Sequence, residues 1–254
     1  MRRDTVHEEY WRIVPGADTA VVFVHGIIGT PDHFKELIPL LPENVTVVNV
    51  LLDGHGGSVK DFANSSMKKW EAQIENVLSE LEKNHERILA VGHSMGTLLL
   101  MDALWNHPKI KAMFFLGSAL AMGPKPLAVR NSLKVIYGKS ENWDPLVIST
   151  NKSCSIMLEK NLFKYLSWIP RYLELFRKAA RVRNNIGEIS IPCTFLQSEK
   201  DELVSKRSCK FIRRNPTMKL TKLPESYHFH YSDKDKNTVR KEFLDWYKEN
   251  TKAE

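Results

Sequence analysis

The chain has 254 residues, 43% of them hydrophobic, and its 37 lysines and arginines against 30 aspartates and glutamates give a formal net charge of +7. This hydrophobic content is too high for a disordered chain and suffices for one large α/β domain or two small ones. The nearest approach to a long apolar stretch, residues 88–105, contains His93, Ser94 and Asp102. We therefore expect no stable membrane insertion.

The amino-terminal segment and the cysteines indicate the compartment. Residues 1–9 contain no apolar run of the kind that signal peptides carry. The three cysteines, Cys154, Cys193 and Cys209, are odd in number and lack metal-type spacing. This pattern favours reduced thiols, so we expect a cytoplasmic protein without a metal site.

The first part of the chain alternates between strand and helix patterns. Residues 20–24 are a continuous β-branched and aromatic run, which predicts a strand covered on both faces. A loop follows at 25–30, and Pro31 opens a predicted helix whose apolar residues repeat at helical spacing as far as Leu41. A second strand is expected at 45–50, and it leads into a glycine-rich turn.

The next strand leads into the most informative motif. A helix is predicted over 67–81, with one apolar stripe formed by Trp70, Ile74, Val77, Leu78 and Leu81. Residues 88–92 then form a short apolar strand that ends in Gly92-His93-Ser94-Met95-Gly96, and a helix leaves over 97–105. A Gly-x-Ser-x-Gly in this context indicates a nucleophile elbow, in which the glycines let strand and helix approach closely. Ser94 is the predicted nucleophile.

The remaining elements complete an α/β pattern. Strands are expected at 112–117, 193–197 and 218–223, and Ser232 begins the last helix. That helix buries Val239, Phe243, Trp246 and Tyr247. The alternation predicts an α/β fold with a mostly parallel central sheet and helices on both faces.

One long segment interrupts this alternation. Residues 121–183 contain no clear strand, but they contain helical patterns at 155–168 and 170–182. We expect this segment to form a helical cap over the carboxyl edge of the sheet, where ligands bind in open α/β folds. The core domain would then comprise 1–120 and 184–254. Four cap aromatics are expected to contact substrate: Trp143, Phe163, Trp168 and Tyr172.

A basic run near the carboxyl terminus could indicate a surface that binds nucleic acid. Residues 206–222 contain seven lysines or arginines and no acid, and only Phe211 interrupts them with an aromatic ring. A nucleic-acid surface would carry stacking aromatics and a known binding motif. The run therefore favours a solvated helix face, and we expect no nucleic-acid partner.

A serine nucleophile requires a base, and the base requires an orienting acid. In a fold with this elbow, the acid and then the histidine follow the serine in the chain. Glu199, Asp201 and Glu202 follow the strand at 193–197, and Asp201 is favoured by its place on that loop. His228 and His230 follow the next strand, and both would point the same way if that stretch were extended.

An oxyanion hole requires two backbone donors. One is expected to be the N–H of Met95, the residue after the nucleophile. The other is expected from the loop after the first long strand, where Ile27 is the candidate and Gly26 permits the bend. His25 and His93 are predicted to stabilise these loops, because only one general base is needed.

These motifs resemble those of the α/β-hydrolase superfamily and, within it, the bacterial carboxylesterase and monoacylglycerol lipase-like group. The matching segments are His25-Gly26-x-x-Gly29, Asp53-Gly54-His55-Gly56-x-Ser58, Gly92-His93-Ser94-Met95-Gly96, Lys200-Asp201 and Ser226-x-His228. The resemblance implies that Ser94 is the nucleophile, Asp201 the acid and His228 the base. It also implies an oxyanion hole at Ile27 and Met95, and a lid at the predicted cap.

The expected activity is hydrolysis of short- to medium-chain carboxylic esters through an acyl-enzyme, with a small-molecule ester as the partner and no cofactor or metal. A monoacylglycerol lipase, a thioesterase or a carbon–carbon bond hydrolase would use the same residues. A small-molecule sensor is the alternative outside enzymes, because fold alone does not decide function. The sequence leaves the acyl group, the alcohol group and the oligomeric state open.

Overall fold

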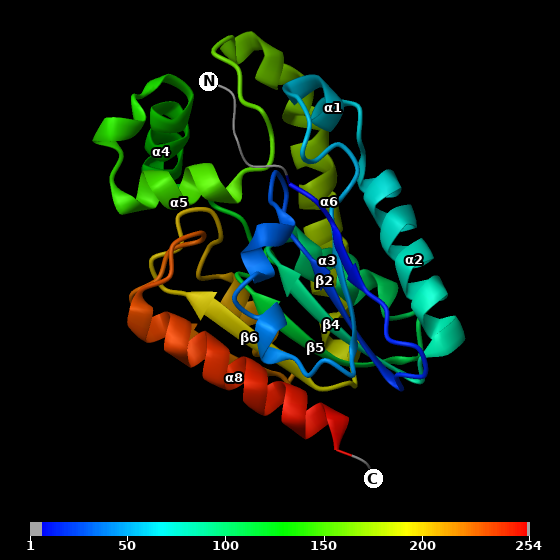
Figure 1. Cartoon of the computed structure of the whole chain (residues 1–254). Coiled ribbons are helices and arrows are strands. Elements are labelled where there is room, and N and C mark those ends of the chain that lie inside the picture. Colours follow the sequence, from blue (N-terminus) through cyan, green and yellow to red (C-terminus); the bar gives the residue numbers. More distant parts are fainter. Residues whose placement is uncertain (1–6, 253–254) are drawn as a thin grey trace.

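The computed structural model describes residues 7–252 and is organised around one seven-stranded sheet (Figure 1). The strands are β1 Tyr10–Arg12, β2 Thr19–Val24, β3 Thr46–Val50, β4 Arg87–His93, β5 Ile110–Leu116, β6 Cys193–Ser198 and β7 Lys219–Leu223. Their order is β1-β3-β2-β4-β5-β6-β7, and every neighbouring pair is parallel except β1 with β3. The predicted mostly parallel sheet is confirmed, whereas β1 was not predicted. The expectation of no signal peptide concerns residues 1–9, of which 1–6 lie outside the described residues.

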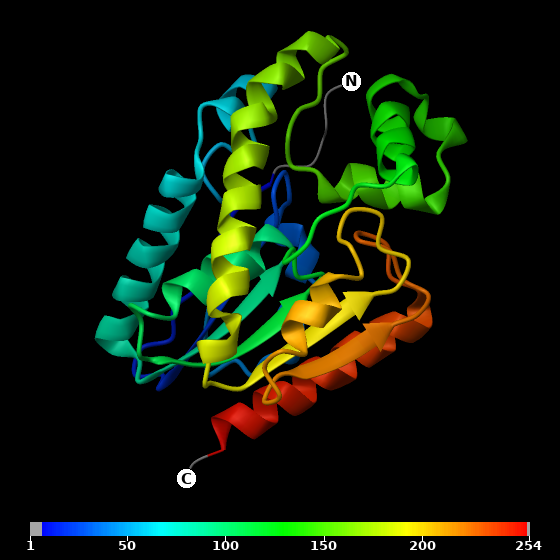
Figure 2. The ribbon, with the colours of Figure 1, turned by 180° about the vertical axis from the view of Figure 1, so that it is seen from behind.

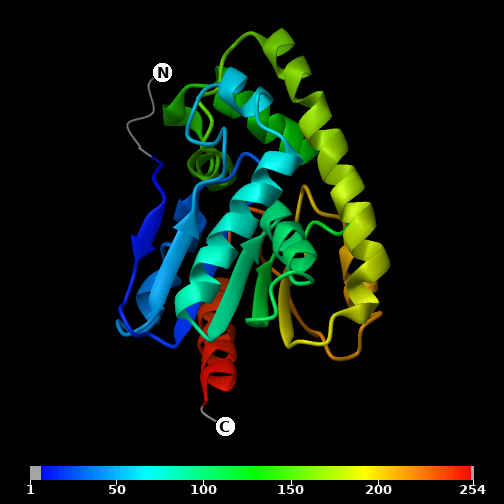
Figure 3. The same ribbon diagram turned by 90° about the vertical axis from the view of Figure 1, so that its right-hand side faces the viewer.

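Helices cover both faces of the sheet. The α-helices are α1 Val59–Ala63, α2 Met67–Asn84, α3 Met95–Ala103, α4 Pro126–Tyr137, α5 Pro145–Ser153, α6 Ile169–Asn185, α7 Ser208–Ile212 and α8 Asp233–Thr251. Five short 3₁₀ segments are η1 Pro31–Phe34, η2 Ile38–Leu40, η3 Ser140–Asn142, η4 Leu162–Trp168 and η5 Ile186–Glu188. Figure 3 shows α2, α3 and α6 on one side of the sheet and α8 on the other. Among the described residues, no helix has both the length and the apolar character needed to cross a bilayer.

The buried side chains form two cores, one on each face of the sheet. Along β2, Val22 and Val24 belong to the core under α2 and α3, while Val21 and Phe23 belong to the core under α8. This alternation is the period of two that a strand imposes. The predicted stripe of α2 is buried, and so are the α8 residues Val239, Phe243 and Trp246, with Tyr247 partly buried.

The helix predicted at residues 31–41 is replaced by η1 and η2. Pro39 lies inside η2, where it lacks the N–H that an α-helix would use and restricts Ile38 before it. The apolar residues nevertheless face the core, because Phe34, Leu37 and Leu41 are all buried. The spacing was therefore predicted correctly and the helix type was not.

The predicted cap divides into two parts. α4 and α5 lie beyond the carboxyl ends of the strands (Figure 1), whereas α6 runs down over one face of the sheet (Figure 2). α6 contacts α3 and α2, and its residues Leu175, Ala179 and Val182 are part of the core. The domain boundaries at 121 and 183 stay a prediction.

The helix predicted at residues 155–168 is wrong for its first half. The backbone N–H of Ser155 donates to the carbonyl of Ile28, and that of Met157 donates to the carbonyl of Gly57. Because loops of the core take these hydrogen bonds, this stretch is not helical. Only η4 is helical within the predicted range.

The basic run is exposed, but it does not form one helix face. All seven of its cations are exposed: Lys206, Arg207, Lys210, Arg213, Arg214, Lys219 and Lys222. They are spread over α7, the turns on both sides of it and β7. The aromatic ring among them, Phe211, is covered by the guanidinium groups of Arg183 and Arg214, at 5.3 and 4.6 Å from its centroid.

Candidate active site

Ser94 lies in the turn between the end of β4 and the start of α3. Its backbone has φ 53° and ψ −116°, a conformation that costs energy for any residue with a side chain. The flanking Gly96 packs so closely on β2 that a Cβ there would collide with the carbonyl of Val24. Gly92 is also closely approached, since a Cβ there would be 2.9 Å from the Thr97 nitrogen. A strained serine between two such glycines is the geometry of the predicted nucleophile elbow. Only 6% of Ser94 is exposed.

The loop after β2 lies directly against Ser94. A Cβ placed on Gly26 would be 2.7 Å from the Ser94 Cβ and 3.3 Å from its Oγ. The next residue is Ile27, and its N–H has no backbone hydrogen bond among the described residues. Met95 is the first residue of α3, and its N–H has no acceptor within the helix. Both N–H groups are therefore free of backbone acceptors, and their role as oxyanion donors stays a prediction.

Two buried histidines tie these loops together. The His25 ring bonds the Gly26 carbonyl through Nδ1, at 2.9 Å, and accepts the N–H of Leu52 at Nε2, at 3.1 Å. The His93 ring bonds the carbonyl of His228 through Nε2, at 3.3 Å. These contacts agree with the structural roles expected for His25 and His93.

Asp201 and His228 meet at the carboxyl edge of the sheet, beyond β6 and β7. The Nδ1–H of His228 donates to Oδ2 of Asp201 at 2.8 Å, and both side chains are buried. The other carboxylate oxygen accepts the N–H groups of Leu203, at 2.8 Å, and Val204, at 2.6 Å. With Nδ1 used as a donor, Nε2 of the neutral ring is left as an acceptor.

The carboxylates near His228 outweigh its burial in setting its pKa. Burial alone would lower the pKa of His228, but the charge of Asp201, the hydrogen bond to it and the charge of Glu202 together raise the pKa above 6.5. Burial likewise acts to raise the pKa of Asp201, but the interactions with His228 and two backbone N–H groups lower it. Asp201 therefore stays ionised and favours a proton on His228.

Glu202 binds the backbone of the histidine loop, a role that the sequence did not predict. Its Oε2 accepts the backbone N–H of His228 at 3.0 Å, and burial raises its pKa. The side chain therefore holds the histidine loop, although the sequence suggested a rival acid or a solvated carboxylate. Glu199, the other rival, lies partly in solvent and pairs with Lys222 at 2.8 Å. No local pattern distinguishes the two glutamates in the sequence.

The His228 ring contacts the ring of His93, the residue before Ser94. The His93 and His228 rings lie 4.8 Å apart between centroids. Among the described residues, Ser94 Oγ has no hydrogen bond to His228. Such catalytic hydrogen bonds are often long in enzymes without substrate and tighten in the complex.

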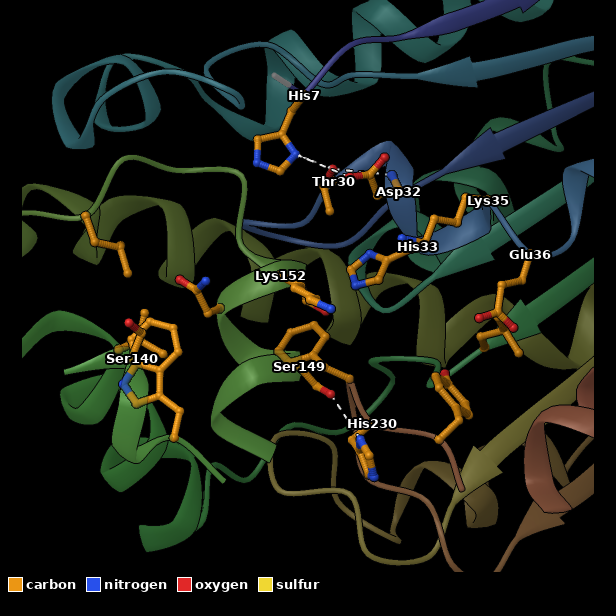
Figure 4. A pocket seen from close by; sticks show the side chains of 18 of the residues that line it. His7, Thr30, Asp32, His33, Lys35, Glu36, Ser140, Ser149, Lys152 and His230 are labelled. Atoms are coloured by element: carbon orange, nitrogen blue, oxygen red, sulfur yellow. Dashed lines mark hydrogen bonds and ion pairs between the residues drawn. The ribbon is translucent and has the colours of Figure 1, made fainter. Parts of the chain in front are cut away.

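His230 points to the cap. Its Nδ1 lies 3.0 Å from the Ser149 Oγ on α5 (Figure 4). The Tyr227 N–H donates to the His230 carbonyl at 2.8 Å, so the chain turns here and is not extended. The two histidines therefore have different partners. The expectation that both side chains point the same way held only for an extended stretch, and the stretch is a turn.

The four predicted cap aromatics lie in different surroundings. Trp143 lines a cavity beneath α4 and α5, whereas Phe163 is 82% exposed. Trp168 is buried, with its Nε1–H donating to the Val59 carbonyl at 2.9 Å. Tyr172 is partly buried against the core and near Cys154. Their contacts with substrate stay a prediction.

A parallel sheet with the order seen here, a serine elbow after β4 and an acid–histidine pair after β6 and β7 defines an α/β-hydrolase. The chain belongs to the family described as serine aminopeptidase, S33, whose model matches residues 15–235. Among the described residues, no group of side chains could hold a metal ion.

Solved structures with this fold include lipolytic enzymes. One comes from a study of the metagenome-derived enzymes LipS and LipT and has a TM-score of 0.72 at 19% identity, covering 96% of this chain and 98% of the other. The monoacylglycerol lipase of Paleococcus ferrophilus has a TM-score of 0.66 at 19% identity, covering 96% and 99%. A soluble variant of monoglyceride lipase from Saccharomyces cerevisiae has a TM-score of 0.66 at 17% identity, covering 99% and 97%.

Curated relatives match over a shorter region. Uncharacterized proteins of Mycobacterium bovis and Mycobacterium tuberculosis are 29% identical to this chain over 106 residues. The match spans 42% of this chain and 30% of the length of those relatives.

Proposed function

We propose that the protein is a serine hydrolase that cleaves short- to medium-chain carboxylic esters. The observation that carries the proposal is the buried hydrogen bond between Asp201 and His228. The strained backbone of Ser94 supports it. The resemblance of the fold to lipases and to monoacylglycerol lipases supports an ester as the substrate.

In this proposal, the Ser94 Oγ attacks the ester carbonyl and gives its proton to Nε2 of His228. Asp201 holds the other ring nitrogen and stabilises the imidazolium. The N–H groups of Ile27 and Met95 stabilise the negative charge on the carbonyl oxygen. The protonated His228 then gives its proton to the leaving alcohol. Water attacks the acyl-enzyme with His228 as base, which releases the acid and restores Ser94.

A substrate panel tests the proposal. It comprises nitrophenyl esters of increasing acyl length, a monoacylglycerol, an acyl thioester and an aminoacyl nitroanilide, the last because of the family's name. We expect the simple esters to be turned over well above a Ser94→Ala background. A monoacylglycerol lipase or a thioesterase remains the alternative if those substrates are preferred. Binding without turnover of any member would favour the sensor alternative.

The rate should fall in acid with a midpoint above pH 6.5. The base must be neutral to act, and the net effect of Asp201 and Glu202 raises the pKa of His228 in the free enzyme. The fraction of active enzyme therefore falls as the pH drops through this raised pKa. The measurement is kcat/KM for a nitrophenyl ester across pH. The Glu202→Gln variant should have a lower midpoint, because one raising charge is removed; a wild-type midpoint below 6.5 would contradict the assignment.

Ester turnover should rise with acyl length and then fall sharply once the pocket is full. Each buried methylene contributes roughly 0.8 kcal/mol, so two carbons change specificity about tenfold. Tyr172 is the cap aromatic to test, because it lies near Cys154. The next residue, Ser155, donates its N–H to the carbonyl of Ile28, which follows the predicted oxyanion donor Ile27. Tyr172→Ala should shift the optimum. The exposed Phe163→Ala serves as the control and should leave the optimum unchanged, while a flat profile in all three proteins would exclude a cap-lined acyl pocket.

A further inference from the structure

A cavity of about 950 Å³ lies between η1, the loop at residues 229–231 and cap residues 135–160 (Figure 4). Ser94 is not among its lining residues. The cavity wall contacts the elbow through rings: the His33 ring contacts His93 at 4.5 Å between centroids and stacks on Phe229 at 5.6 Å. The cavity is large enough for a ligand of drug-like size and lies beside the proposed catalytic residues.

Much of the cavity wall is apolar. It includes Leu116 from the end of β5, Phe229, and the cap side chains Trp143, Met157 and Leu158. Aliphatic and aromatic walls of this kind bury the hydrocarbon part of a ligand. The shape and the wall therefore suit a molecule with an extended apolar body.

The charged side chains around the same cavity are mostly cationic. Six cations line it, namely Lys35, Lys139, Lys152, Lys160, Lys236 and Arg240. Two carboxylates, Asp32 and Glu36, also line it, and Glu36 pairs with Arg240 at 3.0 Å. Among the described residues, the first four lysines have no carboxylate within ion-pair distance. A concave surface on which one sign of charge predominates attracts ions of the opposite sign.

His33 adds a polar group in the wall of this cavity. Both of its ring nitrogens are buried and have no hydrogen-bond partner among the described residues. Buried polar atoms in folded proteins nearly always have partners, so this unpartnered pair is an unusual polar point behind the apolar surface of the wall. Burial and the neighbouring histidines lower the pKa of His33 well below 6.5, so the ring is neutral and offers one donor and one acceptor.

From the apolar wall and the unpaired lysines, we propose that this cavity binds an amphipathic anion, with a carboxylate or phosphate head on a hydrocarbon body. The body packs on the wall at Trp143 and Phe229. The head faces Lys152 and the neighbouring lysines. The lining does not include Ser94, so the proposal holds whether or not the protein hydrolyses esters. It gives Trp143, one of the four cap aromatics predicted to contact the ester, a contact with this ligand instead.

The test is calorimetric titration of the full chain, carrying Ser94→Ala so that nothing is turned over. The ligands are decanoate, decyl phosphate, 1-decanol and inorganic phosphate. We expect decanoate or decyl phosphate to bind at least tenfold more tightly than decanol and inorganic phosphate, and the tighter of the two identifies the head. The double substitution Lys152→Glu with Lys160→Glu should weaken binding of the anion at least tenfold.

The control is Lys68→Glu with Lys69→Glu, a pair on α2 that makes the same change in net charge and does not line the cavity. It should leave affinity within twofold. Circular dichroism and Tm establish that each variant folds, and Lys139→Glu replaces the double variant if that one does not. Equal weakening by the control, equal binding of decanol, or no binding of either anion at millimolar concentration would overturn the proposal.

Discussion

Replacing Ser94 by alanine is expected to lower ester turnover about 10⁶-fold, the size of loss typical of a triad serine. The hydroxyl is the only group of Ser94 that the proposed reaction uses, and alanine keeps the Cβ that packs against Gly26. The positive φ of 53° is equally unfavourable for serine and alanine, so the elbow should keep its shape. We therefore expect little change in Tm.

Covalent labelling tests this prediction directly, because it reports which serine reacts and does not require measurable ester turnover. A fluorophosphonate probe should label Ser94 in the wild-type protein and no other serine. Ser118 is a suitable matched control, because it is also buried near the elbow and its Oγ lies 2.9 Å from the Thr97 Oγ1. Ser118→Ala should still be labelled. Labelling that persists in Ser94→Ala would place the nucleophile elsewhere.

The sequence was sufficient for the elbow, because its requirements are local. A strand, a tight turn and a helix follow one another within 87–103, and only small flanking residues permit that turn. The sheet could be predicted for the same reason: β2 to β7 are short apolar or alternating runs separated by helices. The acid and histidine loops were also found, since each directly follows a predicted strand.

Features that depend on distant contacts could not be predicted. The backbone at 155–157 is not helical because Ser155 and Met157 bond loops more than 90 residues earlier in the chain, and no local pattern encodes those partners. Glu202 differs from Glu199 only in what the fold brings near it. The cationic cavity likewise combines lysines from η1, the cap and α8, which are far apart in the sequence.

The choice between His228 and His230 also depends on contacts that the sequence does not reveal. It leads to the second prediction with a large expected effect on activity. The sequence left His228 and His230 as alternatives, with one reading in which they share a side. In the structure, a turn closed by the Tyr227 N–H and the His230 carbonyl separates them. His228 bonds Asp201 at 2.8 Å, whereas His230 lies 3.0 Å from the Ser149 Oγ on the cap. Their substitutions should therefore have very different consequences.

His228→Ala is expected to lower kcat/KM about 10⁶-fold, because the serine loses its base and the leaving alcohol its proton donor. His230→Ala removes one hydrogen bond to the cap, worth about 1 kcal/mol, and should change kcat/KM by less than roughly tenfold. The two variants form a matched pair, since each deletes one imidazole from the same loop. The decisive measurement is the rate of fluorophosphonate labelling at fixed pH, with Tm as the check on folding. Slow labelling in His230→Ala with normal labelling in His228→Ala would reverse the assignment and make His230 the base.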